Sequence, residues 1–308
     1  MRNSHLITSV GVFALAAMTA ACRSDKITAT TRPALAGVRY VHAVSDTGRL
    51  DFRMVDQIGY SANTIDSAGG IRYRQASRYF PTEAKARHIN VFNYFGTDRS
   101  IPVVSTVMVD TTIAFVAGKN YTLLLVGSAR AAAGTAGRMH FVLIDDTPPA
   151  VDTNVVHVRV VNANTTGSVD AYLVSTSSTA PSGTPAFAAV APGATSSYVA
   201  RPIGPLAVRV ATAGTTTFSD SLSNVAGLGT PGTSTVNPVA GSGRGGTAFS
   251  VYVFAAAVTG SGAFVGIPTS SPAQGVFPAI PLATMFRVRS AELFVDRLPP
   301  NTVPATGQ

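Results

Sequence analysis

The chain has 308 residues, of which 46% are hydrophobic and only 12% are Asp, Glu, Lys or Arg. This charged share is about half of the roughly 25% that is usual in soluble proteins, so Thr, Ser, Asn, Gly and Pro must cover much of the surface. The net charge is +8, but neither half is basic enough to require nucleic acid as a partner, and we expect none. The length predicts about two domains.

The first 21 residues have the pattern of a secretory signal peptide. A short basic segment, Met1 to His5, precedes an apolar run from Leu6 to Ala21. That run is short for a membrane span, which takes about 20 residues. It leads directly to Cys22, the only cysteine of the protein, so an internal disulfide is excluded.

The segment Met18-Thr-Ala-Ala-Cys22 resembles a bacterial lipobox, although Thr19 stands where that pattern prefers Leu. The resemblance implies lipidation at Cys22 and a membrane as partner. Because Arg23 rather than Asp follows, it also implies the outer membrane of the cell envelope. Residues 22–36 are then a lipidated tether. The alternative is ordinary cleavage after Ala20 or Ala21, which leaves a free thiol.

One strand–turn–strand pattern occurs twice in the chain. Val38-Arg-Tyr-Val-His-Ala43 and Leu50-Asp-Phe-Arg-Met-Val55 recur about 120 residues later as Val158-Arg-Val-Val-Asn-Ala163 and Val169-Asp-Ala-Tyr-Leu-Val174. Their period of two predicts strands, and the repetition predicts a duplicated β domain. We therefore predict a first β-sandwich repeat over residues 37–149, a second over residues 150–300, and a tail over residues 301–308.

The rest of each repeat also has the patterns of strands, and no segment after the signal peptide has a helical period. The second repeat contains a Gly-, Ser- and Thr-rich tract, Gly227 to Gly246, which we expect to be flexible and to include an insertion of about nine residues. The predicted fold is all-β. In the first repeat, further strands are expected at 71–80, 88–95, 103–109, 111–116, 121–126 and 139–144, and in the second at 249–254 and 285–294.

These residues resemble the bacterial envelope proteins of domain-of-unknown-function family 4397. The likeness is carried by Val38 to Val55, Tyr79, Gly118 to Tyr121, Val158 to Val174 and Tyr198. It implies tandem immunoglobulin-like sandwiches in a lipoprotein and attaches no activity to them. The family has Ser-Pro-(Asp/Asn) in the first loop, and neither Val44-Ser-Asp nor Asn164-Thr-Thr keeps that proline.

The common catalytic and cofactor motifs have no support in this sequence. Gly241-Ser-Gly-Arg-Gly-Gly246 matches a dinucleotide fingerprint, but a loop precedes it and a strand follows, whereas that motif must open a helix. His42, His88, His140 and His157 are scattered, and zinc ligand spacing is lacking. We therefore predict no metal, no cofactor and no enzymatic activity.

Two aspartates, Asp51 and Asp170, occupy equivalent places in the two repeats. One interpretation is an acid–base or calcium-binding role, which makes the protein a hydrolase or an accessory subunit of one. The other interpretation is structural, with each carboxylate closing a turn by accepting hydrogen bonds from backbone N–H groups.

A basic cluster interleaved with aromatic residues is specific to the first repeat. Arg72 and Arg74 are two residues apart, so on a strand they share one face. Such a face suits an anionic glycan, lipopolysaccharide or another envelope component, and the alternative is a solvated face whose arginines pair with neighbouring acids. The cluster consists of Arg72, Arg74, Arg78, Lys85, Arg87 and His88.

The sequence therefore predicts a non-enzymatic, membrane-anchored lipoprotein of the bacterial envelope. Its expected role is that of a binding, adhesion or envelope-structural module. The hydrolase with Asp51 or Asp170 and the binder of anionic glycan or lipopolysaccharide are the alternatives.

Overall fold

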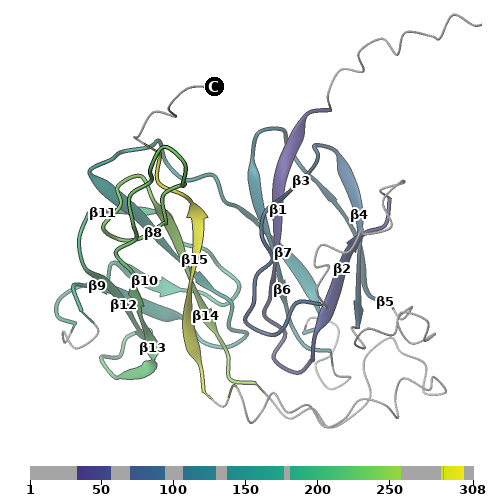
Figure 1. The fold of residues 1–308 in the computed structure, drawn as a ribbon. Helices are drawn as coiled ribbons and strands as arrows, with labels where there is room; N and C mark the ends of the chain where they lie inside the picture. The colour runs from purple at the N-terminus through teal and green to yellow at the C-terminus, as the bar shows by residue number, and fades with distance from the viewer. Residues whose placement is uncertain are drawn as a thin grey trace, which may run out of the picture. The chain divides into compact units, whose positions relative to one another are not determined.

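The computed structural model describes residues 33–56, 70–93, 107–129, 137–176, 181–257, 286 and 288–301. The predicted signal peptide, the lipidation site Cys22, most of the tether and all but the first residue of the tail lie outside these residues. The regular elements of the described part are all strands (Figure 1). That part contains no helix of the length and apolarity that a membrane crossing needs.

The described residues form fifteen strands, seven in the first repeat and eight in the second. Those of the first repeat are β1 (Leu35–His42), β2 (Leu50–Met54), β3 (Phe80–Glu83), β4 (Ala86–Asn93), β5 (Val107–Ala114), β6 (Asn120–Val126) and β7 (His140–Asp145). Those of the second are β8 (Val155–Asn162), β9 (Val169–Val174), β10 (Phe187–Val190), β11 (Val199–Pro202), β12 (Leu206–Thr212), β13 (Phe218–Ala226), β14 (Ala248–Phe254) and β15 (Ser290–Arg297).

Each repeat forms two sheets with the same strand order. In the first repeat the sheets are β3-β1-β6-β7 and β2-β4-β5, and in the second they are β11-β8-β14-β15 and β10-β9-β12-β13. Among the described residues of the first repeat, β10 corresponds to no strand but only to the isolated bridge between Leu50 and Ile71. The predicted all-β fold of two immunoglobulin-like sandwiches is confirmed.

The registers of the central strands show that the two repeats are built alike. β1 and β6 are parallel and pair Val38 with Tyr121, while β8 and β14 are parallel and pair Val158 with Phe249. β6 and β14 are buried along almost their whole length. This explains their nearly continuous apolar sequences, because a strand covered on both faces cannot alternate with polar residues.

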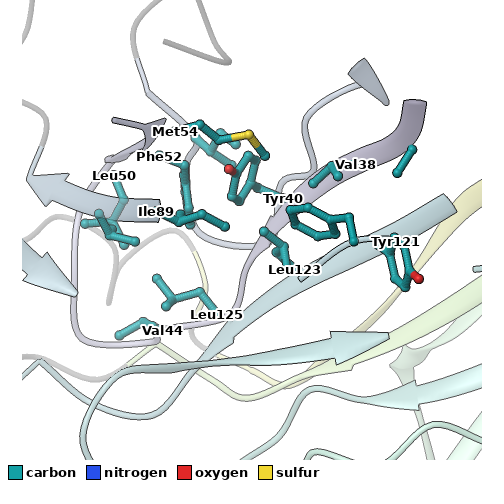
Figure 2. Close-up of a cluster of buried hydrophobic side chains, with 14 of the residues drawn as sticks. Val38, Tyr40, Val44, Leu50, Phe52, Met54, Ile89, Tyr121, Leu123 and Leu125 are labelled. Atoms are coloured by element: carbon teal, nitrogen blue, oxygen red, sulfur yellow. The ribbon is translucent and has the colours of Figure 1, made fainter. Parts of the chain in front are cut away.

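A hydrophobic cluster fills each sandwich. Figure 2 shows that of the first repeat, where Tyr40 and Leu123 from the larger sheet meet Phe52 and Ile89 from the smaller one. The Tyr40 and Phe52 rings lie 4.7 Å apart. The second repeat has its own cluster, built around Val158, Val208 and Val251 in the corresponding strands.

A third cluster joins the two repeats. Because side chains alternate along a strand, Tyr40 points into the first sandwich and its neighbour Val41 points to the other face of the sheet. There Val41 and Leu124 belong to the same buried cluster as Val161 and Tyr252 of the second repeat. The sheet of β1 and β6 and the sheet of β8 and β14 are thus covered on both faces.

The structure corrects the predicted strand at residues 71–80. This segment forms a turn closed by the hydrogen bond from the Gln75 N–H to the Arg72 carbonyl, 3.0 Å long. Strand β3 begins only at Phe80 and contains Pro81. A proline is tolerated there because β3 lies at the edge of its sheet, where one side of the strand needs no N–H donor.

Other differences concern the boundaries of elements. The two strands expected at 103–109 and 111–116 are one continuous strand, β5, and β10 and β13 have no counterpart among the predicted strands. The tract Gly227 to Gly246 is tied to the second sandwich by backbone hydrogen bonds, such as Gly246 N–H to the Val155 carbonyl at 2.8 Å. Strand β14 follows it directly, as expected for a loop rather than a dinucleotide site.

Candidate functional site

The arginine of the repeated Val-Arg motif lies at the junction of the two repeats. Arg39 is on β1, is 3% exposed, and donates through Nη2 to Asp296 Oδ1 of the second repeat at 2.5 Å. Its Nε donates to Thr122 Oγ1 at 2.7 Å, and its Nη1 donates to the Val295 carbonyl at 3.1 Å. The guanidinium also lies over the Tyr79 ring, 4.7 Å from its centre.

In the second repeat, Arg159 makes contacts equivalent to those of Arg39. Arg159 on β8 donates through Nη2 to Asp146 of the first repeat, through Nε to Ser250 Oγ at 2.7 Å, and through Nη1 to the Asp145 carbonyl at 2.9 Å. It lies 4.6 Å from the centre of the Tyr198 ring. Each repeat therefore sends one arginine to the aspartate of the other.

Both aspartates are completely satisfied by these contacts. Asp146 also accepts hydrogen bonds from Tyr79 Oη at 2.7 Å and from the Thr122 hydroxyl. Asp296 accepts from Tyr198 Oη at 2.8 Å and from Ser250 Oγ at 2.5 Å. A buried ion pair is tolerated when its remaining donors and acceptors are hydrogen-bonded in this way. We call this set the reciprocal ion network: Arg39, Arg159, Asp146, Asp296, Tyr79, Tyr198, Thr122 and Ser250.

Burial and charge act against each other on the pKa values of this network. Burial alone would lower the pKa of Arg39, but Tyr252, Asp296 and Asp146 together raise it above its ordinary value. Burial raises the pKa of Asp146, which Arg39 and Arg159 oppose. Burial likewise raises the pKa of Tyr79 and of Tyr198. Both tyrosines are thus neutral donors to the carboxylates.

The histidine of the first motif and the asparagine of the second close equivalent loops. Nδ1 of His42 accepts the Val44 N–H at 3.2 Å and Nε2 lies 2.9 Å from the Gly48 carbonyl. In the second repeat, Oδ1 of Asn162 accepts the N–H of Asn164 at 3.2 Å and Nδ2 donates to the Gly167 carbonyl at 3.0 Å. Burial lowers the pKa of His42 to about 4, so the ring is neutral.

The aspartates weighed as catalytic residues have structural partners. Asp170 accepts the Ala189 N–H at 2.7 Å and the Gly214 N–H at 2.8 Å. Asp51 is buried and accepts a hydrogen bond from Arg53 Nη2 at 2.7 Å. The structural interpretation therefore describes Asp170, whose carboxylate holds strand β10 and the turn at Gly214.

The structure divides the predicted basic cluster instead of placing it on one face. Arg72, Arg78 and Lys85 are exposed, whereas Arg74 and Arg87 are buried. The expectation that Arg72 and Arg74 share one face is wrong, because they lie in a turn where Arg74 has a φ of 65°. His88 lies on β4 and contacts Asp110 at 2.6 Å.

Arg87 is the least accessible member of the cluster. It is 1% exposed on β4 and forms ion pairs with Asp56 at 3.4 Å and with Glu83 at 3.5 Å. Pairing with Glu83 agrees with the alternative interpretation of the cluster. Lys85 also pairs with Glu83. Arg87 is therefore part of the first sandwich rather than of a binding surface.

Arg74 reaches across to the second repeat together with Tyr73. Tyr73 Oη donates to the Ala255 carbonyl at 2.6 Å, and Arg74 Nη2 donates to the same carbonyl at 2.6 Å and to the Val288 carbonyl. The Arg74 guanidinium lies 4.9 Å from the centre of the Phe286 ring. Burial raises the pKa of Tyr73 to about 12.

A groove of about 590 Å³ opens where the loops of the two repeats meet. Its walls come from the β1–β2 loop, the β6 and β7 strands, the β8–β9 loop and the β10–β11 turn. The side chains that offer hydrogen-bonding groups or shape its entrance include Ser45, Asp46, His140, Asn164, Pro192 and Gly193. We call it the junction groove.

A second, more open depression of about 720 Å³ lies next to the junction groove and shares Val142 and Gly193 with it. Neither Asp51 nor Asp170 lines either of these two cavities. Within the described ranges, no three His, Cys, Asp or Glu side chains gather as a metal site would require. The convergent polar groups of this part of the chain thus lie at the junction of the repeats.

The sequence contains repeated charged residues that pair at the junction, but it does not show the pairing. The sequence repeats the Arg of the Val-Arg motif. It also repeats an Asp shortly before two prolines, in Asp146-Thr-Pro-Pro149 and Asp296-Arg-Leu-Pro-Pro300. A charged residue at an inward or covered strand position, repeated in both copies, is the signal that could have identified them. This signal does not show which aspartate pairs with which arginine, because Arg39 and Asp296 are 257 residues apart in the chain.

Comparison with known protein families gives one match. Residues 36–172 match the model of a family described as a domain of unknown function, DUF4397. The matched segment begins in β1 and ends in β9, so it contains the Val-Arg motif of both repeats, with Arg39 and Arg159. No curated protein matches the chain. Over residues 36–172, the chain is thus similar to this family of unknown function.

Proposed function

We propose that the protein is a non-enzymatic lipoprotein of the bacterial envelope, anchored in a membrane through Cys22, and that it acts as a rigid binding module. The observation that carries this proposal is the reciprocal ion network. It commits the buried arginines and aspartates of the junction to holding two sandwiches together. A scaffold built in this way keeps the loops of both repeats at fixed positions around the junction groove, as binding sites on rigid frameworks require.

The alternative of a hydrolase has less support. Its candidate residue Asp170 accepts two backbone hydrogen bonds, and Asp51 is paired with Arg53. A general base must reach a substrate proton within hydrogen-bonding distance in a pocket. Neither carboxylate lines the two cavities at the junction.

Fewer basic side chains than predicted are exposed and able to bind an anionic ligand. Arg72, Arg78 and Lys85 keep exposed charges, whereas Arg74 and Arg87 are committed to protein partners. The hypothesis of an anionic ligand assumed a larger set of exposed cations than these three. Acidic glycan and lipopolysaccharide thus remain secondary candidates for this surface.

Crosslinking in intact cells tests the proposed function. A photoreactive residue placed at Thr165 in the junction groove should capture a discrete partner, which mass spectrometry then identifies. The same probe at the exposed Gly183, on the second repeat outside both cavities, is the control. Capture only of lipopolysaccharide would favour the anionic alternative. Capture of nothing at either position would count against a binding role.

The anchor has its own test. Replacing Cys22 by Ala should move the protein from the membrane fraction to the soluble fraction, because diacylation anchors stably whereas an unmodified N-terminus does not. Mass spectrometry of the wild-type N-terminus should find fatty acid on Cys22. Fractionation that is unchanged in the variant, with no fatty acid on the wild type, would refute the lipoprotein assignment.

A further inference from the structure

Two turns at the junction share one backbone conformation but carry different side chains. Arg74 donates its N–H to the His42 carbonyl at 2.9 Å and has a φ of 65°. In the second repeat, Gly193 donates its N–H to the Asn162 carbonyl at 2.7 Å and has a φ of 72°. Arg74 and Gly193 therefore occupy the same place in their repeats, and Tyr73 corresponds to Pro192.

The turn of the first repeat inserts its two side chains into the second repeat. Tyr73 and Arg74 share the Ala255 carbonyl as acceptor, both at 2.6 Å. The Tyr73 ring meets that of Phe286 edge-on, with centroids 5.5 Å apart. A side chain at positive φ clashes with its own backbone, so this conformation is unfavourable for an L-residue. The strained backbone of Arg74 is thus maintained where the side chain gains buried partners.

The equivalent place on the other side of the junction is the junction groove. By the registers of the central strands, Val126 corresponds to Phe254, and Gly127 therefore to Ala255. Pro192 and Gly193 cannot reach this surface as Tyr73 and Arg74 reach theirs, because they lack the long donor side chains. Instead, Gly127 and Gly193 both line the cavity of about 590 Å³. Within the described ranges, one half of the repeated interface is filled by the chain, and the other half is open.

The junction groove offers a negative charge and an apolar wall, which suit an arginine and an aromatic ring like those of Arg74 and Tyr73. Asp46, which is 2% exposed, brings a carboxylate that accepts the Ser128 hydroxyl at 2.5 Å and the Ala129 N–H. The carboxylate keeps these partners, and its negative charge lowers the electrostatic energy of a cation bound nearby in the groove. Val126 and Val142 give the wall an apolar part on which a ring can pack.

We propose that the junction groove binds a peptide segment of a partner protein in which an aromatic residue is followed by an arginine. The segment takes the place that Tyr73 and Arg74 occupy on the opposite side of the junction. This proposal rests on the proposed function as a binding module and names the chemistry of its partner.

A peptide with the sequence of the filled turn is the probe. Acetyl-Ile-Arg-Tyr-Arg-Gln-Ala-amide, which copies residues 71–76, is titrated into the isotope-labelled mature chain, and amide resonances are followed by NMR. The peptide should shift the resonances of Gly193, His140 and Asn164 in a saturable manner. Replacing its Tyr and second Arg by Ala should weaken binding at least tenfold.

Variants that fill the groove from within provide the second measurement. The double change Pro192→Tyr with Gly193→Arg recreates the first turn in the second repeat, and a Cβ at Gly193 has no heavy atom within 4 Å. It should abolish peptide binding. The matched control is Gly183→Arg, which has the same left-handed backbone with a φ of 78° and the same open surroundings, but lies outside the groove. This control should bind as the wild type does.

Two outcomes would overturn the proposal: no saturable shifts in the wild type at millimolar peptide, or binding that survives the double change in a variant whose thermal unfolding midpoint equals that of the wild type. If crosslinking at Thr165 captures a protein while the peptide fails to bind, the partner chemistry is wrong but the binding function stands. If neither gives a signal, both proposals fail.

Discussion

Arg39 lies between two aspartates, one in each repeat, with its Nε 3.7 Å from Asp146 and its Nη2 2.5 Å from Asp296. Arg159 occupies the mirrored position, with its Nε 3.7 Å from Asp296. Removing one member of a buried ion pair leaves an uncompensated charge in a medium that solvates it poorly. The network therefore makes single substitutions at the junction costly.

Arg39→Met should lower the free energy of unfolding by about 3–5 kcal/mol, because it removes the partner of Asp296 and leaves the carboxylate buried. Urea denaturation followed by circular dichroism measures the change. Arg72→Met, which removes an exposed arginine of the same repeat, is the matched control and should stay within about 0.5 kcal/mol. Equal stability of the two variants would show that the network contributes nothing.

His42 gives the junction loop a pH dependence of known sign. Its pKa is lowered from 6.5 to about 4 in the folded protein, so the unfolded chain binds more protons at this site between these pH values. The stabilising effect of the neutral ring is complete above pH 6.5 and is lost as the pH falls towards 4. The total corresponds to roughly 3 kcal/mol.

The variant His42→Asn, which copies the residue of the second repeat, should lose this dependence. The Asn side chain can accept and donate as Asn162 does in its loop. The free energy of unfolding of the wild type minus that of the variant should fall as the pH is lowered from 6.5 to 4. A difference that stays constant over this range would show that His42 is not protonated preferentially on unfolding.

At the scale of elements, a side chain of β9 helps to hold the irregular strand β10. Asp170 accepts the Ala189 N–H, and the pairing of β10 with β9 shifts register between Phe187 and Val190. Ala189 has a φ of 47°, which few non-glycine residues adopt. The carboxylate thus holds an irregular strand in place.

Asp170→Ala should destabilise the protein by about 2–4 kcal/mol, since hydrogen bonds to a charged group contribute roughly 1.5–3 kcal/mol each and partly exposed donors regain water. Hydrogen exchange should show faster exchange at Ala189 and Gly214. If Asp170 were instead catalytic, the variant would lose an activity while its stability stayed unchanged, and that result would restore the hydrolase interpretation.

At the scale of the molecule, the part that the structure describes has three hydrophobic clusters, one in each repeat and one shared between them. Each repeat has a complete pair of sheets, and we predict that each folds by itself. Separation exposes the shared cluster and unpairs the reciprocal ion network. The fragments should therefore be less stable than the whole chain and should bind each other.

Fragments 35–149 and 150–301 test this directly. Each should give a cooperative thermal transition below that of the intact protein, and mixing them should raise both transitions, because binding to the folded state stabilises it. A first fragment carrying Arg39→Met should associate more weakly than the wild-type fragment. Fragments that are unfolded alone would show that the two repeats form a single folding unit, contrary to the two-domain prediction.

Much of the fold followed from the sequence because its signals are local. Alternation of apolar residues identified β1, β2, β8 and β9, nearly continuous apolar runs identified β6 and β14, and the repetition of Val-Arg-x-Val identified the duplication. Residues 71–79 were misassigned because the turn depends on the backbone of Arg74 at positive φ. No composition rule indicates an arginine in that conformation, and only its contacts with Ala255 and Val288 explain it.

The sequence by itself determined that two β-sandwiches follow each other, since strand periodicity and repetition are properties of neighbouring residues. The tertiary structure alone decided which of the charged residues are buried. Arg39 and Arg159 each pair with an aspartate of the opposite repeat. Arg74 does not share a face with Arg72 as predicted but contacts the second repeat at the junction. Burial and pairing depend on contacts between residues far apart in the chain, and a local pattern carries no information about such partners.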